Sequence, residues 1–220
     1  MSNPSYPYTV LAREGWPFIA LFLLLTVLAG IFAPWWAGIP FFLLFLFSVQ
    51  FFRDPARALP AALAGGILCP ADGRVIAIEM VEDPYLQRQA LKISIFMNVF
   101  DVHVNRLPIG GTVQQRWYFP GKFFNAALDK ASLENERNAL WLRTEDGQDV
   151  TVVQVAGLVA RRILCYVRPE EQVGTGQRFG FIRFGSRVDT YLPLSAQALV
   201  HLGQRVRSGA EWIAQLEQGG

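Results

Sequence analysis

The sequence predicts a mainly β soluble domain, a β-sandwich or open barrel with a few short helices, preceded by an N-terminal hydrophobic helical hairpin. Two observations support this. The 38 positions 15–52 hold no charged residue, whereas 18 of the 20 Lys and Arg residues follow Arg53. Beyond Leu59, short apolar and β-branched runs alternate with turn residues, which is typical of many short strands. We therefore expect a membrane-associated segment at residues 1–56 and a soluble domain at residues 57–220.

The apolar segment contains two runs, residues 17–33 and 38–52, separated by Pro34-Trp35-Trp36. Each run is somewhat shorter than the ~20 residues that one membrane span needs. A helical hairpin that crosses twice and a re-entrant hairpin both fit, and both return the chain to its starting side. The flanking basic residues predict that this side is the cytoplasm: Arg13, Arg53 and Arg57. A signal peptide fits less well, because its apolar region is shorter and is followed by a small-residue cleavage site.

The soluble domain is expected to begin with a strand, a turn and a second strand within residues 67–78, because an Asp-Gly pair favours a turn. The β-branched, apolar run 91–100 predicts a buried strand. Similar runs predict further strands at residues 110–113, 139–143, 150–157, 160–167, 181–184 and 187–192. A helix is expected at 125–138, which is polar, and a C-terminal helix or a pair of turns at 194–218. In the second, apolar residues recur at helical spacing and His201 would lie on the surface.

Composition narrows the classes of function. The net charge of +2 is too small to indicate a nucleic-acid partner. Cys69 and Cys165 lie far apart without a CxxC pair, which excludes a disulfide scaffold or zinc ribbon and suits a reducing cytoplasm. His103 and His201 are the only histidines, so we expect no metal site.

Two short motifs contain candidate catalytic groups. His103 follows a predicted buried strand, and strand alternation would place Asp101, His103 and Asn105 on one face. A single histidine is more often a packing or surface residue, so the two neighbouring polar groups strengthen the case for function. Asp72 lies in the sequence Pro-Ala-Asp-Gly, where an ordinary turn aspartate is the simpler interpretation.

The third candidate is the Gly185-Ser186 pair, which separates two apolar strand segments. A β-bulge at the glycine would explain it structurally. Alternatively, the Ser186 hydroxyl attacks the Gly185 carbonyl once a base removes its proton. The resulting ester could break by β-elimination, and hydrolysis of the dehydroalanine would leave a pyruvoyl group.

Taken together, the motifs resemble the phosphatidylserine decarboxylase proenzymes, specifically their short bacterial and archaeal type. The matching stretches follow one another through the soluble domain: PADGRV (70–75), FDVHVNRLP (100–108), GKFFNA (121–126), DKAS (129–132), ENER (134–137), VARR (159–162) and RFGFIRFGSRVD (178–189). An N-terminal hydrophobic hairpin is also usual in such proteins.

The resemblance implies self-cleavage between Gly185 and Ser186, giving a β chain of residues 1–185 and an α chain of residues 186–220 that remain associated. Ser186 would become a covalent pyruvoyl cofactor, with no separate cofactor and no metal. The pyruvoyl group would form a Schiff base with the amine of phosphatidylserine in the membrane, and loss of CO2 would give phosphatidylethanolamine. The site would lie at the cytoplasmic face of the cell membrane. Homo-oligomerisation stays open.

Within this scheme, we expect His103 to return a proton to the substrate carbon, because imidazole exchanges protons near neutral pH. Asp72 would orient and support a base during self-cleavage. Longer members of the family carry a second histidine where this chain has Arg106. Either His103 therefore serves both steps or another group activates Ser186. Arg106 would instead hold the lipid phosphate or the departing carboxylate.

Residues 119–138 are expected to cover the substrate near the bilayer, although an ordinary charged surface segment would look similar. Phe123 would contact acyl chains, and the polar candidates for headgroup binding are Lys122, Asn125 and Arg137.

Other functions remain open. The same chemistry could act on an ether lipid such as archaetidylserine. A tethered β carrier or binding module needs a lysine at a hairpin tip, which Lys92, Lys122 and Lys130 do not provide in the predicted pattern. An uncleaved structural paralogue would not need to retain Gly185-Ser186 and His103.

Overall fold

A computed structural model describes residues 10–121, 134–157, 162–183 and 185–217. Two compact units divide the chain between Ala56 and Arg57.

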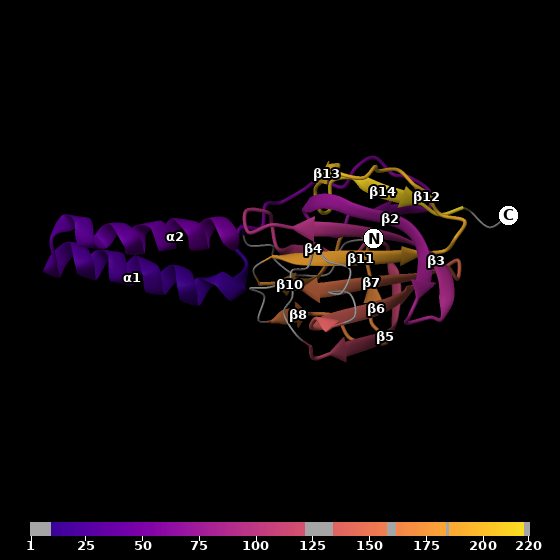
Figure 1. Ribbon diagram of the computed structural model, residues 1–220, viewed down its shortest axis with the longest axis horizontal. Coiled ribbons are helices and arrows are strands. Elements are labelled where there is room, and N and C mark those ends of the chain that lie inside the picture. The colour runs from indigo at the N-terminus through magenta and orange to yellow at the C-terminus, as the bar shows by residue number, and fades with distance from the viewer. Residues whose placement is uncertain (1–9, 122–133, 158–161, 184, 218–220) are drawn as a thin grey trace. The chain divides into compact units, whose positions relative to one another are not determined.

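The N-terminal unit is a helical hairpin (Figure 1). A short 3-10 turn, η1 (Arg13–Gly15), leads into α1 (Trp16–Phe32), and η2 (Trp35–Gly38) leads into α2 (Ile39–Phe51). A proline stands in the first turn of each helix, where its missing N–H costs no hydrogen bond. At the base of the hairpin, the Ala12 N–H donates to the Phe52 carbonyl over 2.7 Å. The predicted hairpin is thus confirmed, and both of its ends lie together.

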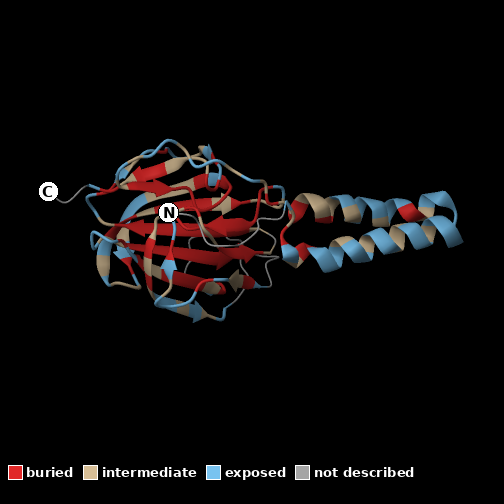
Figure 2. Ribbon diagram, turned by 180° about the vertical axis from the view of Figure 1, so that it is seen from behind, coloured by how far each residue is buried: buried red, intermediate tan, exposed pale blue. Residues whose placement is uncertain are grey.

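The surface of this unit is apolar. Helix α1 has no buried residue, and η1 with α1 forms one helical stretch of 20 residues, Arg13–Phe32, long and apolar enough to cross a membrane. Both helices expose large apolar side chains, so they are mostly pale blue and tan in Figure 2. Because exposed apolar surface of this extent is unfavourable in water, the unit is suited to association with a membrane.

The second unit is built on an antiparallel sheet of eight strands in the order β13-β2-β3-β11-β7-β6-β5-β9 (Figure 1). Its strands are β2 (Gly73–Asp83), β3 (Arg88–Met97), β5 (Gly111–Phe119), β6 (Arg137–Arg143), β7 (Asp149–Ala156), β9 (Gln172–Val173), β11 (Ser186–Leu192) and β13 (Arg205–Val206). Two three-stranded sheets, β1-β14-β12 and β4-β10-β8, complete the fold. Their strands are β1 (Gly66–Leu68), β4 (Val104–Arg106), β8 (Ile163–Cys165), β10 (Arg178–Ile182), β12 (Gln197–Ala198) and β14 (Trp212–Gln215). The predicted mainly β class is confirmed.

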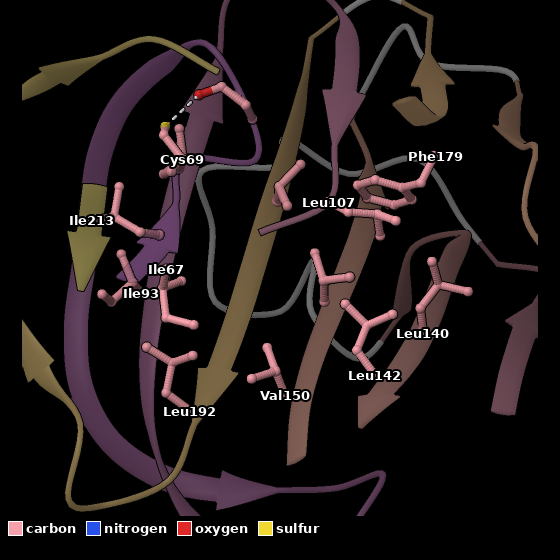
Figure 3. Close-up of a cluster of buried hydrophobic side chains, with 14 of the residues drawn as sticks. Ile67, Cys69, Ile93, Leu107, Leu140, Leu142, Val150, Phe179, Leu192 and Ile213 are labelled. Atoms are coloured by element: carbon pink, nitrogen blue, oxygen red, sulfur yellow. Dashed lines mark hydrogen bonds between the residues drawn. The ribbon is translucent and has the colours of Figure 1, made fainter. Parts of the chain in front are cut away.

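The main core lies between the large sheet and the two small ones (Figure 3). Ile93 and Leu140 of the large sheet, Ile67 and Ile213 of one small sheet, and Phe179 of the other are all fully buried. Burial of such apolar side chains supplies most of the favourable free energy of folding. The core therefore joins segments from both ends of the domain sequence.

Strand β11 is central. It pairs with β3 from Ser186↔Met97 to Leu192↔Leu91, and with β7 from Ser186↔Ala156 to Tyr191↔Thr151. All seven of its residues are buried. The strand is therefore held along both edges by residues that precede it in the sequence.

Of the two alternatives predicted for 194–218, a helix or a pair of turns, the helix is wrong. Residues 194–217 form turns and the short strands β12, β13 and β14, and His201 is exposed in a turn. Gly203 and Gly209 have φ angles of +84° and +74°, which do not occur within a right-handed helix. In addition, β14 forms an antiparallel pair with β1. The predicted helix at 125–138 lies mostly outside the described residues, and its last two residues, 137 and 138, belong to β6.

Candidate active site

The Gly185-Ser186 bond lies where an irregular segment enters the central strand. Gly185 has φ +60°, in the left-handed region that L side chains avoid, and Ser186 is the first residue of β11. A Cβ built on Gly185 would meet no atom within 4 Å, so backbone conformation and not crowding favours glycine here. The sequence thus places a glycine, which adopts the left-handed conformation without strain, directly before a rigidly paired residue.

Ser186 faces the core side of the sheet, as do Val188 and Leu192 two and six residues later. Its side chain is fully buried, and its hydroxyl donates to the Met97 sulfur over 3.5 Å. A thioether is a weak acceptor, so this contact orients the hydroxyl without strongly polarising it. The surroundings keep bulk water away from the hydroxyl.

His103 is fully buried immediately before β4. Its Nδ1 lies 2.9 Å from the Asp101 carbonyl oxygen, which can only accept a hydrogen bond, so Nδ1 carries the proton in the neutral ring. The Ile182 N–H donates to the His103 carbonyl, and the imidazole lies 6.3 Å from the Phe181 ring. Since β10 leads to Ser186 within four residues, the fold brings His103 close to the chain segment that enters the reactive bond.

Asp72 is held by other partners. Arg57 binds both carboxylate oxygens, with a 2.7 Å contact from Nη2 to Oδ2, and the Ser208 N–H donates to Oδ1 over 2.8 Å. Burial alone would lower the Arg57 pKa, but the hydrogen bond and attraction of Asp72 outweigh it and raise that pKa. Among the described residues, Arg57 and Ser208 are the hydrogen-bond partners of Asp72, so the structure does not join Asp72 to His103.

Arg106 points away from Ser186. Its guanidinium donates to the Gly176 carbonyl over 3.4 Å, and its stem packs beside Gly209. The preceding residue, Asn105, faces the opposite side of β4 and reaches Met97. Arg106 therefore does not replace the missing second histidine at the Ser186 hydroxyl.

Of the remaining predicted residues, Arg137 lies in the described part of the chain. Arg137 begins β6, and its guanidinium stacks 4.3 Å from the centre of the Phe119 ring. It pairs with Val155, which pairs with Arg187, so it lies on the sheet face opposite the Ser186 side chain. Lys122, Phe123 and Asn125 lie outside the described residues.

Sequence reasoning missed the polar partners of this site. Met97 contacts the hydroxyl of Ser186 and also the amide nitrogen of Asn105, at 3.6 Å. Gln154 donates to the oxygen of the same Asn105. The available signal was a buried glutamine within the apolar run of β7, since such a residue needs a polar partner. Within the described part of the chain, no three His, Cys, Asp or Glu side chains gather as a metal site would need.

Comparison with known proteins defines the class. Residues 44–214 match the family model described as phosphatidylserine decarboxylase. The chain is similar to proteins named phosphatidylserine decarboxylase proenzyme. One, from Nitrosomonas europaea, is 60% identical over 94% of this chain and 95% of that protein. Others from Aromatoleum aromaticum and Ralstonia pickettii are 59% and 58% identical, each over 98% of this chain and the full length of the relative. The protein is thus a carboxy-lyase, and it belongs to the phosphatidylserine decarboxylase family.

Proposed function

We propose that this protein decarboxylates phosphatidylserine to phosphatidylethanolamine and CO2, using a pyruvoyl group that it makes from Ser186 by self-cleavage. The observation that carries the proposal is the geometry at residues 185 and 186. A left-handed glycine precedes a buried serine that opens a central strand. Family membership supports the decarboxylation, and this geometry supports the self-processing.

Self-cleavage needs only the chain and one water molecule. The Ser186 Oγ attacks the Gly185 carbonyl carbon, and the C–N bond breaks to give an ester and a free amine at residue 186. A base then removes the Ser186 α-proton, and the Gly185 carboxylate departs from Cβ. The dehydroalanine tautomerises to an imine, and water replaces its nitrogen, which leaves as ammonia. The new group is a pyruvoyl amide at the start of the smaller chain.

The site residues fit this group. The pyruvoyl ketone would condense with the substrate amine and accept the electron pair released with CO2. The enclosed position of Ser186 would limit the access of water to the substrate carbon that holds this electron pair. We propose that His103 returns the proton to the substrate carbon through Nε2, because its Nδ1–H is committed to the Asp101 carbonyl.

The strand pairing supports a processed enzyme that stays in one piece. Residues 186–192 lie between β3 and β7, both of which would belong to the larger chain. Removing a buried central strand would break its backbone hydrogen bonds on both edges, which costs a large free energy. The two chains would therefore remain associated after cleavage.

The hairpin supports a membrane location. Its exposed apolar side chains suit lipid, and Arg13, Arg53 and Arg57 flank the segment on one side. By the distribution of positive charge, we propose that the soluble domain lies on the cytoplasmic face, where it would meet its lipid substrate. An ether-linked lipid with the same headgroup would undergo the same chemistry.

Intact-protein mass spectrometry tests the proposal. The purified protein should give two polypeptides separated after Gly185, the smaller with a mass that corresponds to pyruvoyl in place of serine. Ser186→Ala should give one uncut chain without decarboxylase activity. A wild-type protein that stays uncut on long incubation would favour a tethered binding module or an uncleaved paralogue. Product analysis with ester-linked and ether-linked serine lipids then identifies the substrate.

A further inference from the structure

A series of hydrogen bonds runs through the core to the site of proposed cleavage. We call it the amide network: Arg116, Asn138, Gln154 and Asn105. Arg116 Nε donates to Asn138 Oδ1 over 2.7 Å, and Asn138 Nδ2 donates to Gln154 Oε1 over 3.0 Å. Gln154 Nε2 donates to Asn105 Oδ1 over 2.8 Å. The network ends at Met97, the residue that also accepts from Ser186.

Arg116 fixes the direction of every bond in the network. A guanidinium carries donors only, so Asn138 has to present its oxygen to Arg116 and its NH2 group to Gln154. Gln154 must then turn its own NH2 group toward Asn105. By the same logic, Asn105 has to present an N–H, and not an oxygen, to the sulfur of Met97. A charge at an exposed residue thereby sets the orientation of an amide in the buried site.

Burying the amide network restricts the surrounding structure. Asn138, Gln154 and Asn105 are fully buried, and buried amides destabilise a core unless their hydrogen bonds are made. Gly180 of β10 faces Gln154, and a Cβ built there would overlap the Gln154 amide nitrogen and the Leu164 carbonyl oxygen. Apolar side chains of similar volume would fill the same space without hydrogen bonds to satisfy. Packing alone therefore does not explain why amides with a fixed orientation occupy these positions.

We propose that the amide network positions the nucleophile for self-cleavage. Two donors, Asn105 Nδ2 and Ser186 Oγ, converge on one sulfur, at 3.6 Å and 3.5 Å. The network fixes the Met97 thioether, and the thioether in turn fixes the rotamer of the Ser186 hydroxyl. Asn105, Gln154, Asn138 and Arg116 are thus positioning residues. This inference rests on the proposed function, since it concerns the reaction of Ser186.

Reversing the network should misplace the hydroxyl. Arg116→Glu puts a carboxylate oxygen, which only accepts hydrogen bonds, where Arg116 has its donor Nε, because both atoms lie the same number of bonds from Cα. Asn138 would then turn its NH2 group outward, Gln154 and Asn105 would follow, and Asn105 would offer its oxygen to the Ser186 hydroxyl. An amide oxygen is a much stronger acceptor than a thioether, so the hydroxyl would be drawn toward Asn105.

The experiment follows cleavage of freshly made precursor in a cell-free synthesis with phosphatidylglycerol and phosphatidylethanolamine vesicles, measured on gels over time. We expect Arg116→Glu to slow cleavage by between about tenfold and about a hundredfold, the usual cost of a misplaced reacting group. Arg116→Gln can still donate a hydrogen bond from the same position, so its cleavage rate should stay within about threefold of the wild-type rate. The small loss is expected because a neutral donor replaces a charged one. Gln204→Glu is the matched control, since the Gln204 side-chain oxygen contacts the backbone N–H and the Nδ1 of His201 at the surface, away from the amide network.

Arg116 is exposed, so its variants are expected to fold, and thermal unfolding checks this. Met97→Leu gives an independent test, because it keeps the packing and removes the sulfur, and it should slow cleavage as Arg116→Glu does. Equal rates for Arg116→Glu and Arg116→Gln, with Met97→Leu unaffected, would overturn the positioning role while leaving the proposed function intact. A wild-type precursor that never cleaves would instead overturn the proposed function, and the network's role with it.

Discussion

The backbone N–H of Ser208 donates to the Asp72 carboxylate over 2.8 Å, although 136 residues separate the two in sequence. Arg57 binds both partners, since its Nη1 also donates to the Ser208 carbonyl over 2.7 Å. Cleavage after Gly185 would leave Asp72 and Arg57 in the larger chain and Ser208 in the smaller one. This contact therefore supplements β11 in holding the two proposed chains together.

Substitutions of Asp72 and Arg57 can distinguish an effect on stability from an effect on self-cleavage. Asp72→Asn keeps an acceptor for Ser208 and removes the charge, whereas Arg57→Met keeps the carboxylate. Each should lower the free energy of unfolding by about 1–3 kcal/mol, because a largely buried ion pair is lost. If Asp72 supports the base in self-cleavage, only Asp72→Asn should also slow cleavage strongly. Denaturant unfolding and a cleavage time course measure the two effects, and equal cleavage rates in both variants would remove Asp72 from the reaction.

The left-handed conformation of Gly185 predicts a graded series of variants. Alanine at this position should cost about 1–2 kcal/mol in the observed conformation, and asparagine less, because asparagine tolerates the left-handed region. Since no atom lies within 4 Å of the added Cβ, the effect should come from the backbone alone. We expect precursor cleavage to slow in the order Gly185→Asn, Gly185→Ala, Gly185→Val. A Gly185→Val precursor that cleaves as fast as wild type would show that the conformation is not needed.

His103→Ala separates cleavage from turnover. We expect the processed variant to decarboxylate phosphatidylserine about 10²- to 10⁴-fold more slowly, the usual contribution of a positioned general acid. Mass spectrometry of the same sample reports the cleaved fraction, so activity is expressed per processed molecule. Full activity in processed His103→Ala would assign the proton transfer to another group.

The sequence predicted the parts of the fold that have a local signature. The hairpin followed from 38 uncharged positions, and strands β2, β3, β7 and β11 from their β-branched composition. The C-terminal helix failed because its apolar spacing is helical, whereas its pairing partner, β1, lies about 150 residues earlier and leaves no local trace. Local composition cannot show which distant strand will supply the hydrogen bonds.

The same distinction applies to the site. Asn105 was expected beside His103, because alternation along one strand is a local property. The contacts of Met97 with Ser186 and of Gln154 with Asn105 were not expected, since they depend on pairings between strands that are distant in the sequence. Arg106 lies on the opposite side of β4 from Asn105, and its expected contact with the lipid phosphate or carboxylate stays a prediction.

Cys69 reports on the integrity of the core. Its thiol is fully buried and donates to the Ala71 carbonyl over 3.0 Å, as Figure 3 shows. Burial disfavours the thiolate and raises the pKa of Cys69 far above its ordinary value. We therefore expect Cys69 to resist a thiol reagent at pH 7.5 until the domain unfolds, and Cys165→Ser protein to show no rapid labelling. Fast labelling of that variant under native conditions would mean that the core opens readily.

Removal of residues 1–56 tests whether the domain is self-sufficient. The cut keeps Arg57, whose contacts with Asp72 and Ser208 belong to the domain. The main core, the three sheets and the amide network also lie entirely beyond residue 56. We therefore expect a protein that stays in solution without detergent and still cleaves after Gly185, but turns over vesicle-bound phosphatidylserine more slowly than the full chain. Arg57→Met in the truncated protein is the matched control for stability. A truncated chain that folds, as judged by cooperative thermal unfolding, yet never cleaves would mean that the hairpin contributes to the reaction itself.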